Sequence, residues 1–186
     1  MLEEYPKQVT LKDNTALTLR PMTRDDEHSV YMFFSSLPEE SRRYLRNDVT
    51  NRKIIAQWMR QLNYDKTIPI MAEYNGKIIA STTLHLQTFG WGRHVGEVRM
   101  VIDPALQGRG LSGLLFDEIS RVGEKIGLKK LVARIVTARA EVIKAFENSG
   151  FSRVAVLEKY VKDMRQQYAD IAIMVKELTP VTSVGK

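Results

Sequence analysis

The sequence predicts one domain of the α/β (α+β) class, in which a central mixed, mostly antiparallel sheet is flanked by helices on both faces. The length of 186 residues is close to that of one compact domain. The predicted order is a hairpin, helices, an antiparallel run and then strand, helix, strand, helix, strand, which is typical of such a sheet. Because we find no repeat or linker, we expect a single domain over residues 1–178 and a flexible C-terminal tail over residues 179–186.

The opening hairpin consists of residues 9–12 and 16–20, which alternate in character around Asp13-Asn14. Thr23 and Asp26 have the spacing of a capping box, in which two side chains satisfy backbone amides at a helix start. They predict a helix directly after this point. Its apolar side chains fall close to helical spacing, and they are Val30, Met32, Phe33, Phe34 and Leu37.

Two more helices are expected before the next strands. Pro38-Glu39-Glu40 is a strong helix start that leads into residues 41–46, because proline fits the first turn and acidic groups favour the positive end of the helix dipole. The apolar residues between positions 54 and 62 also recur at helical spacing.

After Pro69, residues 70–74 and 77–84 give the strongest hairpin signal of the chain. Asn75-Gly76 between them suits the left-handed backbone of a two-residue turn, so we expect this pair to be antiparallel. Residues 95–102 form a further predicted strand.

Helices and strands alternate in the rest of the chain. An amphipathic stretch over residues 114–126 should be a helix that ends at Gly127, and residues 131–136 form an apolar strand. Residues 140–148 are expected to be helical up to Gly150. Two closing strands are expected near residues 154–157 and 171–175.

The composition is that of a globular protein, with 44% hydrophobic and 27% charged residues. The absence of cysteine excludes disulfides, thiolate metal sites and a cysteine nucleophile. Residues 1–7 lack the pattern of a secretory signal, and no stretch approaches the roughly 20 apolar residues that span a bilayer. We therefore expect a cytoplasmic protein without membrane contact.

The net charge of +6 arises from 28 basic and 22 acidic residues, and suits nucleic acid, an acidic protein or a phosphate-rich cofactor. The basic residues are spread along the chain, and the aromatic and glycine pattern of an RNA-binding platform is missing. We therefore expect no nucleic-acid partner.

The loop Gln107-Gly108-Arg109-Gly110-Leu111-Ser112 separates a predicted strand from a predicted helix. Its glycines let the backbone approach a ligand, and the first free amides of the helix point at whatever lies there. An anion gains from these amides and from the helix dipole, and Arg109 adds a positive charge. The spacing matches neither the dinucleotide-binding glycine motif nor the nucleotide phosphate loop. The sequence thus predicts an anion site, with a plain glycine turn as the alternative.

Residues 100–115, which read Met-Val-Ile-Asp-Pro-Ala-Leu-Gln-Gly-Arg-Gly-Leu-Ser-Gly-Leu-Leu, resemble the acyl-CoA signature of the GNAT superfamily of N-acyltransferases. The core pattern of that signature is Gln/Arg-x-x-Gly-x-Gly/Ala. Residues 145–151, which end in Gly-Phe, are similar to the family's second signature, and the likeness extends over about residues 17–178 with its core at about 95–151. The resemblance implies an acyl-CoA-dependent N-acetyltransferase that uses acetyl-CoA (coenzyme A) as co-substrate.

The resemblance also implies which residues hold coenzyme A. The segment Met100-Val101-Ile102 would splay from its neighbouring strand and present backbone groups to the pantetheine arm. The loop and the first helical turn would take the pyrophosphate. The residues concerned are Gln107, Gly108, Arg109, Gly110, Leu111, Ser112 and Gly113.

Three positions depart from the family pattern. Ser112 replaces a glycine or alanine and is small enough to keep the close approach. Arg139 replaces a cofactor-contacting asparagine, and either pairs with a coenzyme A phosphate or is a solvated loop charge. Phe146 replaces a tyrosine that serves many members as general acid, so we expect it to pack in the core or against pantetheine. The leaving thiolate, with a thiol pKa of about 8.5, then takes its proton from water or another side chain, or needs little help.

An attacking amine with a pKa of about 10.4 arrives as an ammonium ion and must lose a proton before direct attack. Glu97, on the strand before the loop, resembles the catalytic carboxylate of the family's protein-lysine acetylating branch, which implies a general base. We expect partial burial to raise its pKa toward neutral pH, and a water to carry the proton. An exposed carboxylate at a strand edge is the alternative.

The leading acceptor is a protein lysine, because residues 19–27 and 33–43 resemble the N-terminal part of bacterial protein acetyltransferases. The loop 89–94 either forms the rim of the acceptor cleft, or its Trp91 packs over a strand end. A small-molecule amine is the alternative acceptor, and a non-catalytic acyl-CoA sensor is the alternative function. The oligomeric state stays open between a monomer and a homodimer.

Two further residue types have less specific roles. His28, His85 and His94 lack metal-ligand spacing, so we expect surface or structural histidines and no metal. Tyr44, Tyr160 and Tyr168 either supply a proton from the acceptor side or pack with a solvated hydroxyl.

Overall fold

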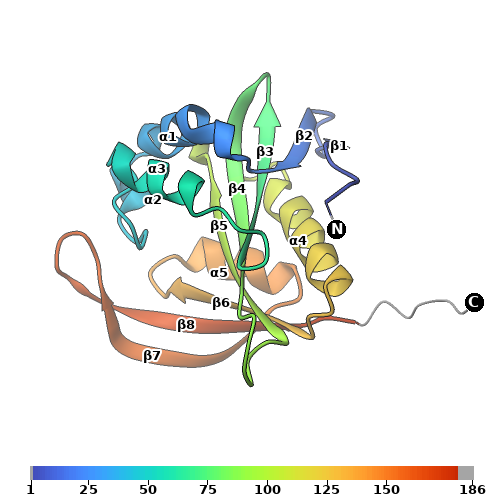
Figure 1. Ribbon diagram of the computed structural model, residues 1–186. Coiled ribbons are helices and arrows are strands. Elements are labelled where there is room, and N and C mark those ends of the chain that lie inside the picture. Colours follow the sequence, from blue (N-terminus) through green and yellow to red (C-terminus); the bar gives the residue numbers. More distant parts are fainter. Residues whose placement is uncertain (1, 180–186) are drawn as a thin grey trace, which may run out of the picture.

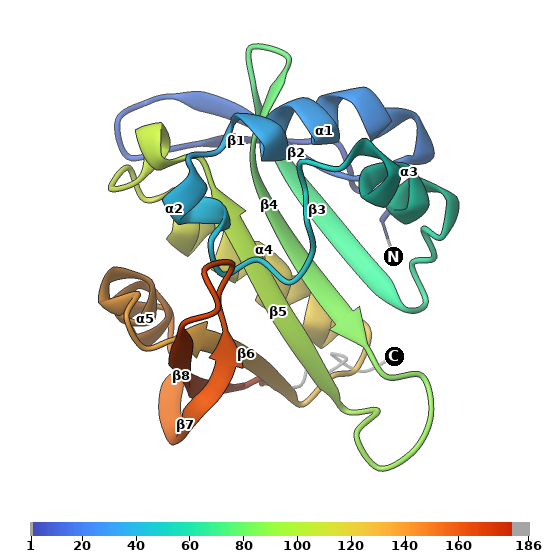
Figure 2. The same cartoon turned by 90° about the vertical axis from the view of Figure 1, so that its left-hand side faces the viewer.

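The computed structural model describes residues 2–179, and its strands form one sheet in the order β1-β2-β3-β4-β5-β6-β8-β7 (Figure 1). Within these residues β5 and β6 pair in parallel, and every other neighbouring pair is antiparallel. Helices cover both faces (Figures 1 and 2). The predicted fold class is therefore confirmed. The predicted tail lies outside the described residues, apart from Thr179.

Four strands and three α-helices of the described chain precede β5. They are β1 (Lys7–Thr10), β2 (Ala16–Pro21), α1 (Glu27–Ser36), α2 (Glu39–Arg42), α3 (Arg52–Arg60), β3 (Thr67–Tyr74) and β4 (Lys77–Leu86). Both predicted hairpins are present, and the predicted capping box joins Thr23 and Asp26 before α1, at a short 3-10 turn (Arg24–Asp26).

Several boundaries in this half were predicted wrongly. The strand β1 covers Lys7–Thr10 rather than residues 9–12. The helix α2 ends at Arg42 rather than reaching residue 46, because the following segment leaves the helix and crosses to the sheet. The strand β3 begins at Thr67 and contains Pro69. Proline has no amide hydrogen to donate, and it is tolerated here because it lies beside the end of β2, where the ladder stops. The carbonyl of Pro69 still accepts a hydrogen bond from the amide of Met22 at 2.9 Å.

The second half contains β5 (Val95–Ile102), a 3-10 turn (Pro104–Leu106), α4 (Leu111–Lys125), β6 (Lys130–Val136), α5 (Ala140–Asn148), β7 (Ser152–Lys162) and β8 (Tyr168–Glu177). The bounds of β5 and α5 are those predicted. Gly127 and Gly150 follow α4 and α5 with φ of 83° and 86°, a left-handed conformation that suits glycine. β7 and β8 are much longer than predicted, and form a hairpin that extends beyond the sheet (Figure 1).

Two apolar cores lie between the sheet and the helices, one on each face of the sheet. On one face, α4 and α5 pack on the sheet through side chains such as Leu115, Ile119 and Phe146. On the other face, α1 and α3 pack on β3 and β4 through a second cluster that includes Phe34 and Ile55. Since successive strand residues point to opposite faces, Val98 joins the first core, whereas Glu97 and Arg99 face the side of α1 and α3.

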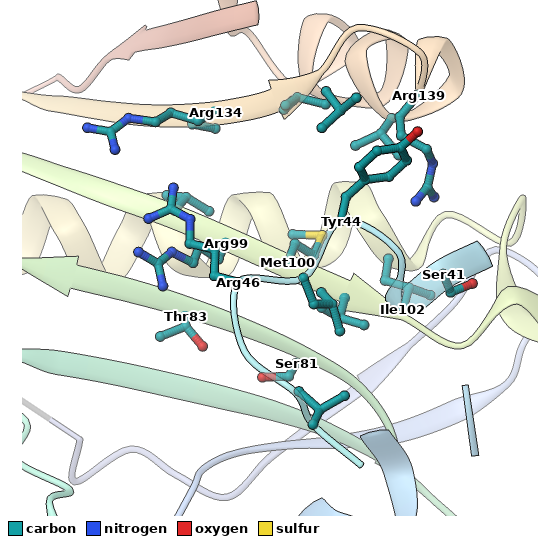
Figure 3. Close-up of a pocket in the computed structure, with 18 of the residues that line it drawn as sticks. Ser41, Tyr44, Arg46, Ser81, Thr83, Arg99, Met100, Ile102, Arg134 and Arg139 are labelled. Carbon is teal, nitrogen blue, oxygen red and sulfur yellow. The ribbon is translucent and has the colours of Figure 1, made fainter. Parts of the chain in front are cut away.

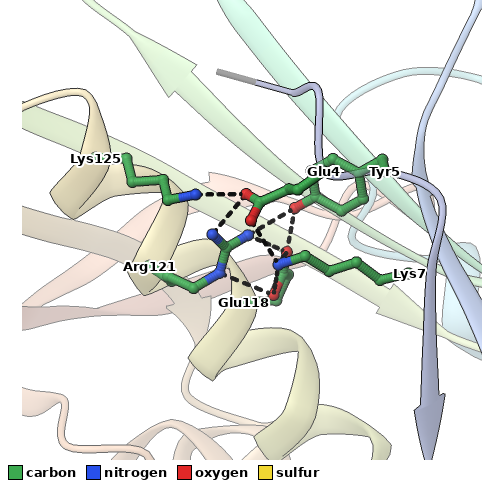
Figure 4. A network of polar contacts seen from close by, with 6 residues as sticks. All are labelled: Glu4, Tyr5, Lys7, Glu118, Arg121 and Lys125. Atoms are coloured by element: carbon green, nitrogen blue, oxygen red, sulfur yellow. Dashed lines mark hydrogen bonds and ion pairs between the residues drawn. The ribbon is translucent and has the colours of Figure 1, made fainter.

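The segment before β1 is fastened to α4 by a polar network around Glu118 (Figure 4). The carboxylate accepts hydrogen bonds from the Tyr5 hydroxyl, from Lys7 Nζ at 3.1 Å and from Arg121 Nη2 at 2.6 Å. Burial would raise the pKa of Glu118, but these donors outweigh burial and hold that pKa below its usual value. The ionised carboxylate thus ties the N-terminal segment to the helix that carries the glycine loop.

Candidate functional site

The strands β5 and β6 separate after a short parallel ladder. Their pairing consists of Val95 with Lys130, Gly96 with Leu131 and Glu97 with Val132. Beyond Glu97, residues 98–102 pair with β4 on one side and have no strand partner on the β6 side among the described residues. The splay at Met100-Val101-Ile102 is therefore present, and it leaves backbone donors and acceptors open to a ligand.

A cavity of about 1090 Å³ occupies this separation (Figure 3). On one side it reaches the glycine loop and α5, and on the other it reaches β4, α3 and the segment after α2. Nine of the predicted cofactor-binding residues line it. They are Met100, Val101, Ile102, Gln107, Gly108, Leu111, Ser112, Arg139 and Phe146. Arg109, Gly110, Gly113 and Glu97 are not among the lining residues.

The glycine loop presents a row of free backbone donors. Gly108 and Gly110 adopt φ of 79° and 87°, and Gly110 is the N-cap of α4. The amides of residues 108–113 donate no hydrogen bond to another residue of the described chain, and the first helical bond runs from the Leu114 amide to the Gly110 carbonyl at 3.2 Å. The amide of Gln107 donates to the Pro104 carbonyl at 3.3 Å, so the open row begins at Gly108. Such a row at a helix start suits a phosphate group.

The arginines near the coenzyme end of the cavity already have acidic partners. Arg109 Nη1 lies 3.4 Å from a carboxylate oxygen of Asp13, and both side chains are exposed. Arg139, at the start of α5, has its Nε 2.6 Å from Glu141 Oε1 and lines the cavity. A phosphate would have to share these guanidinium groups with the carboxylates.

Glu97 is held by three arginines. Its Oε1 lies 2.6 Å from Arg46 Nη2 and 3.4 Å from Arg99 Nε, and its Oε2 lies 3.9 Å from Arg134 Nη1. Burial would raise the pKa of Glu97, but the charges of these arginines outweigh burial and hold that pKa below its usual value. The expected rise toward neutral pH is therefore wrong, because the sequence did not reveal the arginine neighbours.

His85 lies opposite Glu97 in the β4–β5 ladder and lines the cavity. Burial, together with the charge of Arg99, lowers the pKa of His85 to about 4, so the ring is neutral at pH 7. The sequence suggested a surface or structural histidine. Its place in the cavity could be found only from the strand register, which aligns Ser81, Thr83 and His85 with Val101, Arg99 and Glu97.

The aromatic candidates divide into core and cavity residues. Phe146 is 4% exposed, and its ring centroid lies 4.3 Å from that of Phe116 and 4.9 Å from that of Phe151. Phe146 therefore packs in the core, and it also lines the cavity. Tyr44 and Tyr160 line the cavity, and Tyr168 does not.

Both interpretations of the loop 89–94 are wrong. None of its residues lines the cavity, and it lies at the far end of β4 and β5 (Figure 2). Phe89 and Trp91 are 87% and 93% exposed, so Trp91 packs over no strand end.

Residues 2–179 contain no group of three or more His, Asp or Glu side chains that is arranged to hold a metal ion. None of their helices combines the length and apolar character that a membrane crossing requires.

A sequence model of the Acetyltransferase (GNAT) family matches residues 29–151. A curated Bacillus subtilis (strain 168) protein with the name "Putative phosphinothricin acetyltransferase YwnH" is 25% identical over 127 residues, which cover 66% of this chain and 76% of that protein. The GNAT domain of Streptomyces lividans PAT superposes with a TM-score of 0.77 at 20% identity, over 94% of this chain and 100% of that one. Salmonella typhimurium yncA, solved with its cofactor acetyl-CoA, gives 0.74 at 17% identity, over 91% and 98%.

Proposed function

Because the chain belongs to the GNAT acetyltransferase family, it is an acetyl-CoA-dependent N-acetyltransferase, and we propose that its acceptor is the primary amine of a small molecule. One observation carries the proposal. The separation of β5 from β6 after Glu97 opens a single cavity that joins the glycine loop to the face of Arg99 and His85. A thioester bound from one side of the sheet would meet an amine bound from the other.

The residues on the coenzyme side fit acetyl-CoA, which supplies the acetyl thioester. The free amides of residues 108–113 and the positive end of the α4 dipole suit a pyrophosphate. The unpaired backbone of residues 100–102 can bond the amides of the pantetheine arm, as a neighbouring strand would. Phe146 supplies an apolar wall, and Arg139 a positive charge at the start of α5.

We assign the acceptance of the amine proton to Glu97, through a water molecule. Its Oε2 accepts no hydrogen bond from another residue of the described chain, so it is free to bind a water. Because the pKa of Glu97 is low, the carboxylate does not keep the proton, which passes on to solvent. The neutral amine then attacks the acetyl carbonyl carbon, and the thiolate leaves without a tyrosine at position 146.

Two observations favour a small acceptor over a protein lysine. The segment after α2 passes close to the tip of the β7–β8 hairpin, on the face of the sheet that carries Arg99 and His85 (Figure 2). Arg43 in that segment pairs at 2.6 Å with the buried Asp163 in the hairpin tip. This contact leaves less room for the surface of a folded protein to approach the acceptor side of the cavity. The Bacillus subtilis relative is also named for phosphinothricin, which is a small molecule.

Thiol release from acetyl-CoA tests the proposal, with amino acids, polyamines and lysine-containing peptides as acceptors. We expect release with at least one group of small amines and weaker release with peptides. Faster release with lysine peptides would support the protein-lysine prediction instead. Calorimetric binding of acetyl-CoA without release for any acceptor would indicate the non-catalytic sensor.

A further inference from the structure

Three arginines meet at the acceptor end of the cavity. Arg99 comes from β5, Arg134 from β6 and Arg46 from the segment between α2 and α3, and all three line the cavity. Figure 3 shows their guanidinium groups on the same side of the opening between β5 and β6. Their side chains are between 38% and 45% exposed, so a small ligand in the cavity can reach them.

The neighbouring acidic groups do not balance these charges. Glu97 is the one carboxylate of the described chain in an ion pair with them, and all three arginines share it. The acidic residues that line the rest of the cavity are Glu141 and Asp163, which are already paired with Arg139 and Arg43. His85 is neutral and adds no charge. Three positive charges share one negative charge, so an excess of two positive charges remains at this end of the cavity.

The pKa of Arg99 is consistent with this excess. Burial lowers it below the usual value for arginine, and the nearby charges of Arg46 and Arg134 act in the same direction against the opposing effect of Glu97. An anion beside Arg99 would relieve the repulsion among the guanidinium groups.

We propose that the acceptor amine carries an anionic group, a carboxylate or a phosphinate, which binds between Arg99 and Arg134 with Arg46 closing over it. This substrate class rests on the proposed acetyl transfer and specifies its acceptor. A guanidinium group binds such planar or tetrahedral oxyanions with two parallel hydrogen bonds. The ammonium group of the same molecule would then lie near Oε2 of Glu97. The site thus suits a zwitterion of the amino-acid type and disfavours polyamines, whose second cation would meet the arginines.

Coenzyme A does not account for the three arginines. Its pyrophosphate is assigned to the amides of residues 108–113, which follow the C-terminal end of β5. Arg99 lies earlier on β5 and faces the side of α1 and α3, where the acceptor enters. The cluster is therefore available to a second ligand.

Matched pairs of amines test the inference, each an amino acid and its C-terminal amide, together with phosphinothricin. The amide has the less basic amine and would react faster if charge recognition were absent. We expect kcat/KM to be at least about tenfold higher for the free acid, mainly through KM. In Arg99→Gln and Arg134→Gln this preference should fall at least about tenfold, whereas Arg153→Gln, on the exposed edge strand β7, should keep it.

Binding provides a readout that does not need turnover. With coenzyme A present, the free acids should raise the melting temperature of the wild type and not that of Arg99→Gln. Equal rates on acids and amides, or no stabilisation by any acid, would overturn the inference. If amides, polyamines or peptides are acetylated while acids are not preferred, the acetyl-transfer proposal survives alone. If acids bind but no amine is acetylated, the anion site survives and the transfer proposal fails.

Discussion

Arg46 Nη2 lies 2.6 Å from Oε1 of Glu97, although 51 residues separate them and they belong to different layers of the fold. This contact joins the segment after α2 to the last position of β5 that pairs with β6. It also keeps the Glu97 carboxylate ionised, together with Arg99 and Arg134. The contact therefore helps to lower the pKa of the residue that we assign to the amine proton.

Replacement of Glu97 by glutamine should lower kcat by about 10²-fold with little change in the KM for acetyl-CoA, because a general base acts on the amine and not on the coenzyme. Steady-state kinetics on the preferred acceptor measure both constants. Unchanged turnover would remove Glu97 from the mechanism.

The pH profile of kcat/KM distinguishes a base from a counter-ion. Because the pKa of Glu97 is held below its usual value of about 4.5, the acid limb of the wild type should fall below that pH. Arg46→Gln removes one positive charge, so the pKa of Glu97 and with it the acid limb should move to higher pH. An acid limb that keeps its position in both Arg46→Gln and Glu97→Gln belongs to another group.

Gly110→Asp should weaken acetyl-CoA binding by at least about 100-fold, or ~2.7 kcal/mol. Gly110 has a φ of 87°, where a side chain is strained, and the new carboxylate would repel the pyrophosphate. Isothermal titration calorimetry measures the affinity. Gly127→Asp is the matched control, since Gly127 has a φ of 83° and lies at the other end of α4. The control should lose stability and keep acetyl-CoA binding, and equal loss in both variants would point to misfolding.

The stability of the protein should fall as the pH drops from about 6.5 to about 4, in part because of His85. The pKa of this ring is lowered from 6.5 to about 4 on folding, so the unfolded chain binds more protons within this interval and unfolding becomes easier. Carboxylates contribute to acid unfolding too, so the test compares the loss of stability in a variant with the loss in the wild type. In urea titrations at several pH values, His85→Gln should lose less stability than the wild type across this interval, and His28→Gln, at an exposed site, should follow the wild type.

Glu118→Gln should lower the free energy of unfolding by about 1 kcal/mol at pH 7, because hydrogen bonds from Tyr5, Lys7 and Arg121 to a charged acceptor become bonds to a neutral one. The folded-state pKa of Glu118 is below 4.5, so this stabilisation is present above that pH and is lost as the pH falls further. Urea unfolding at pH 7 and pH 3 should therefore show a difference that shrinks with acid. Glu147→Gln, on the exposed side of α5, should show none at either pH.

Local patterns in the sequence were sufficient for the elements that build the coenzyme side. The strand over residues 95–102 and the helix over residues 140–148 have the predicted bounds. Their signals are local: apolar periodicity marks each element, a proline follows the strand and a glycine ends the helix. The strands β7 and β8 were predicted too short, since most residues of β7 are exposed and carry no hydrophobic alternation. The arginine neighbours of Glu97 could not be predicted, because they come from three elements that only the tertiary fold brings together.

Two substitutions at Phe146 distinguish its structural role from a chemical one. Its ring is buried against Phe116 and Phe151, so Phe146→Ala should destabilise the protein by about 3–5 kcal/mol through loss of packing. Phe146→Tyr keeps the ring and restores the hydroxyl that many family members have at this position. Because a thiol with a pKa of about 8.5 leaves readily without a proton donor, we expect kcat to be unchanged in this variant. Steady-state kinetics together with a melting curve test both variants. A clear rise in kcat for Phe146→Tyr, at unchanged stability, would show that departure of the thiolate limits the reaction and that the native chain lacks an acid it could use.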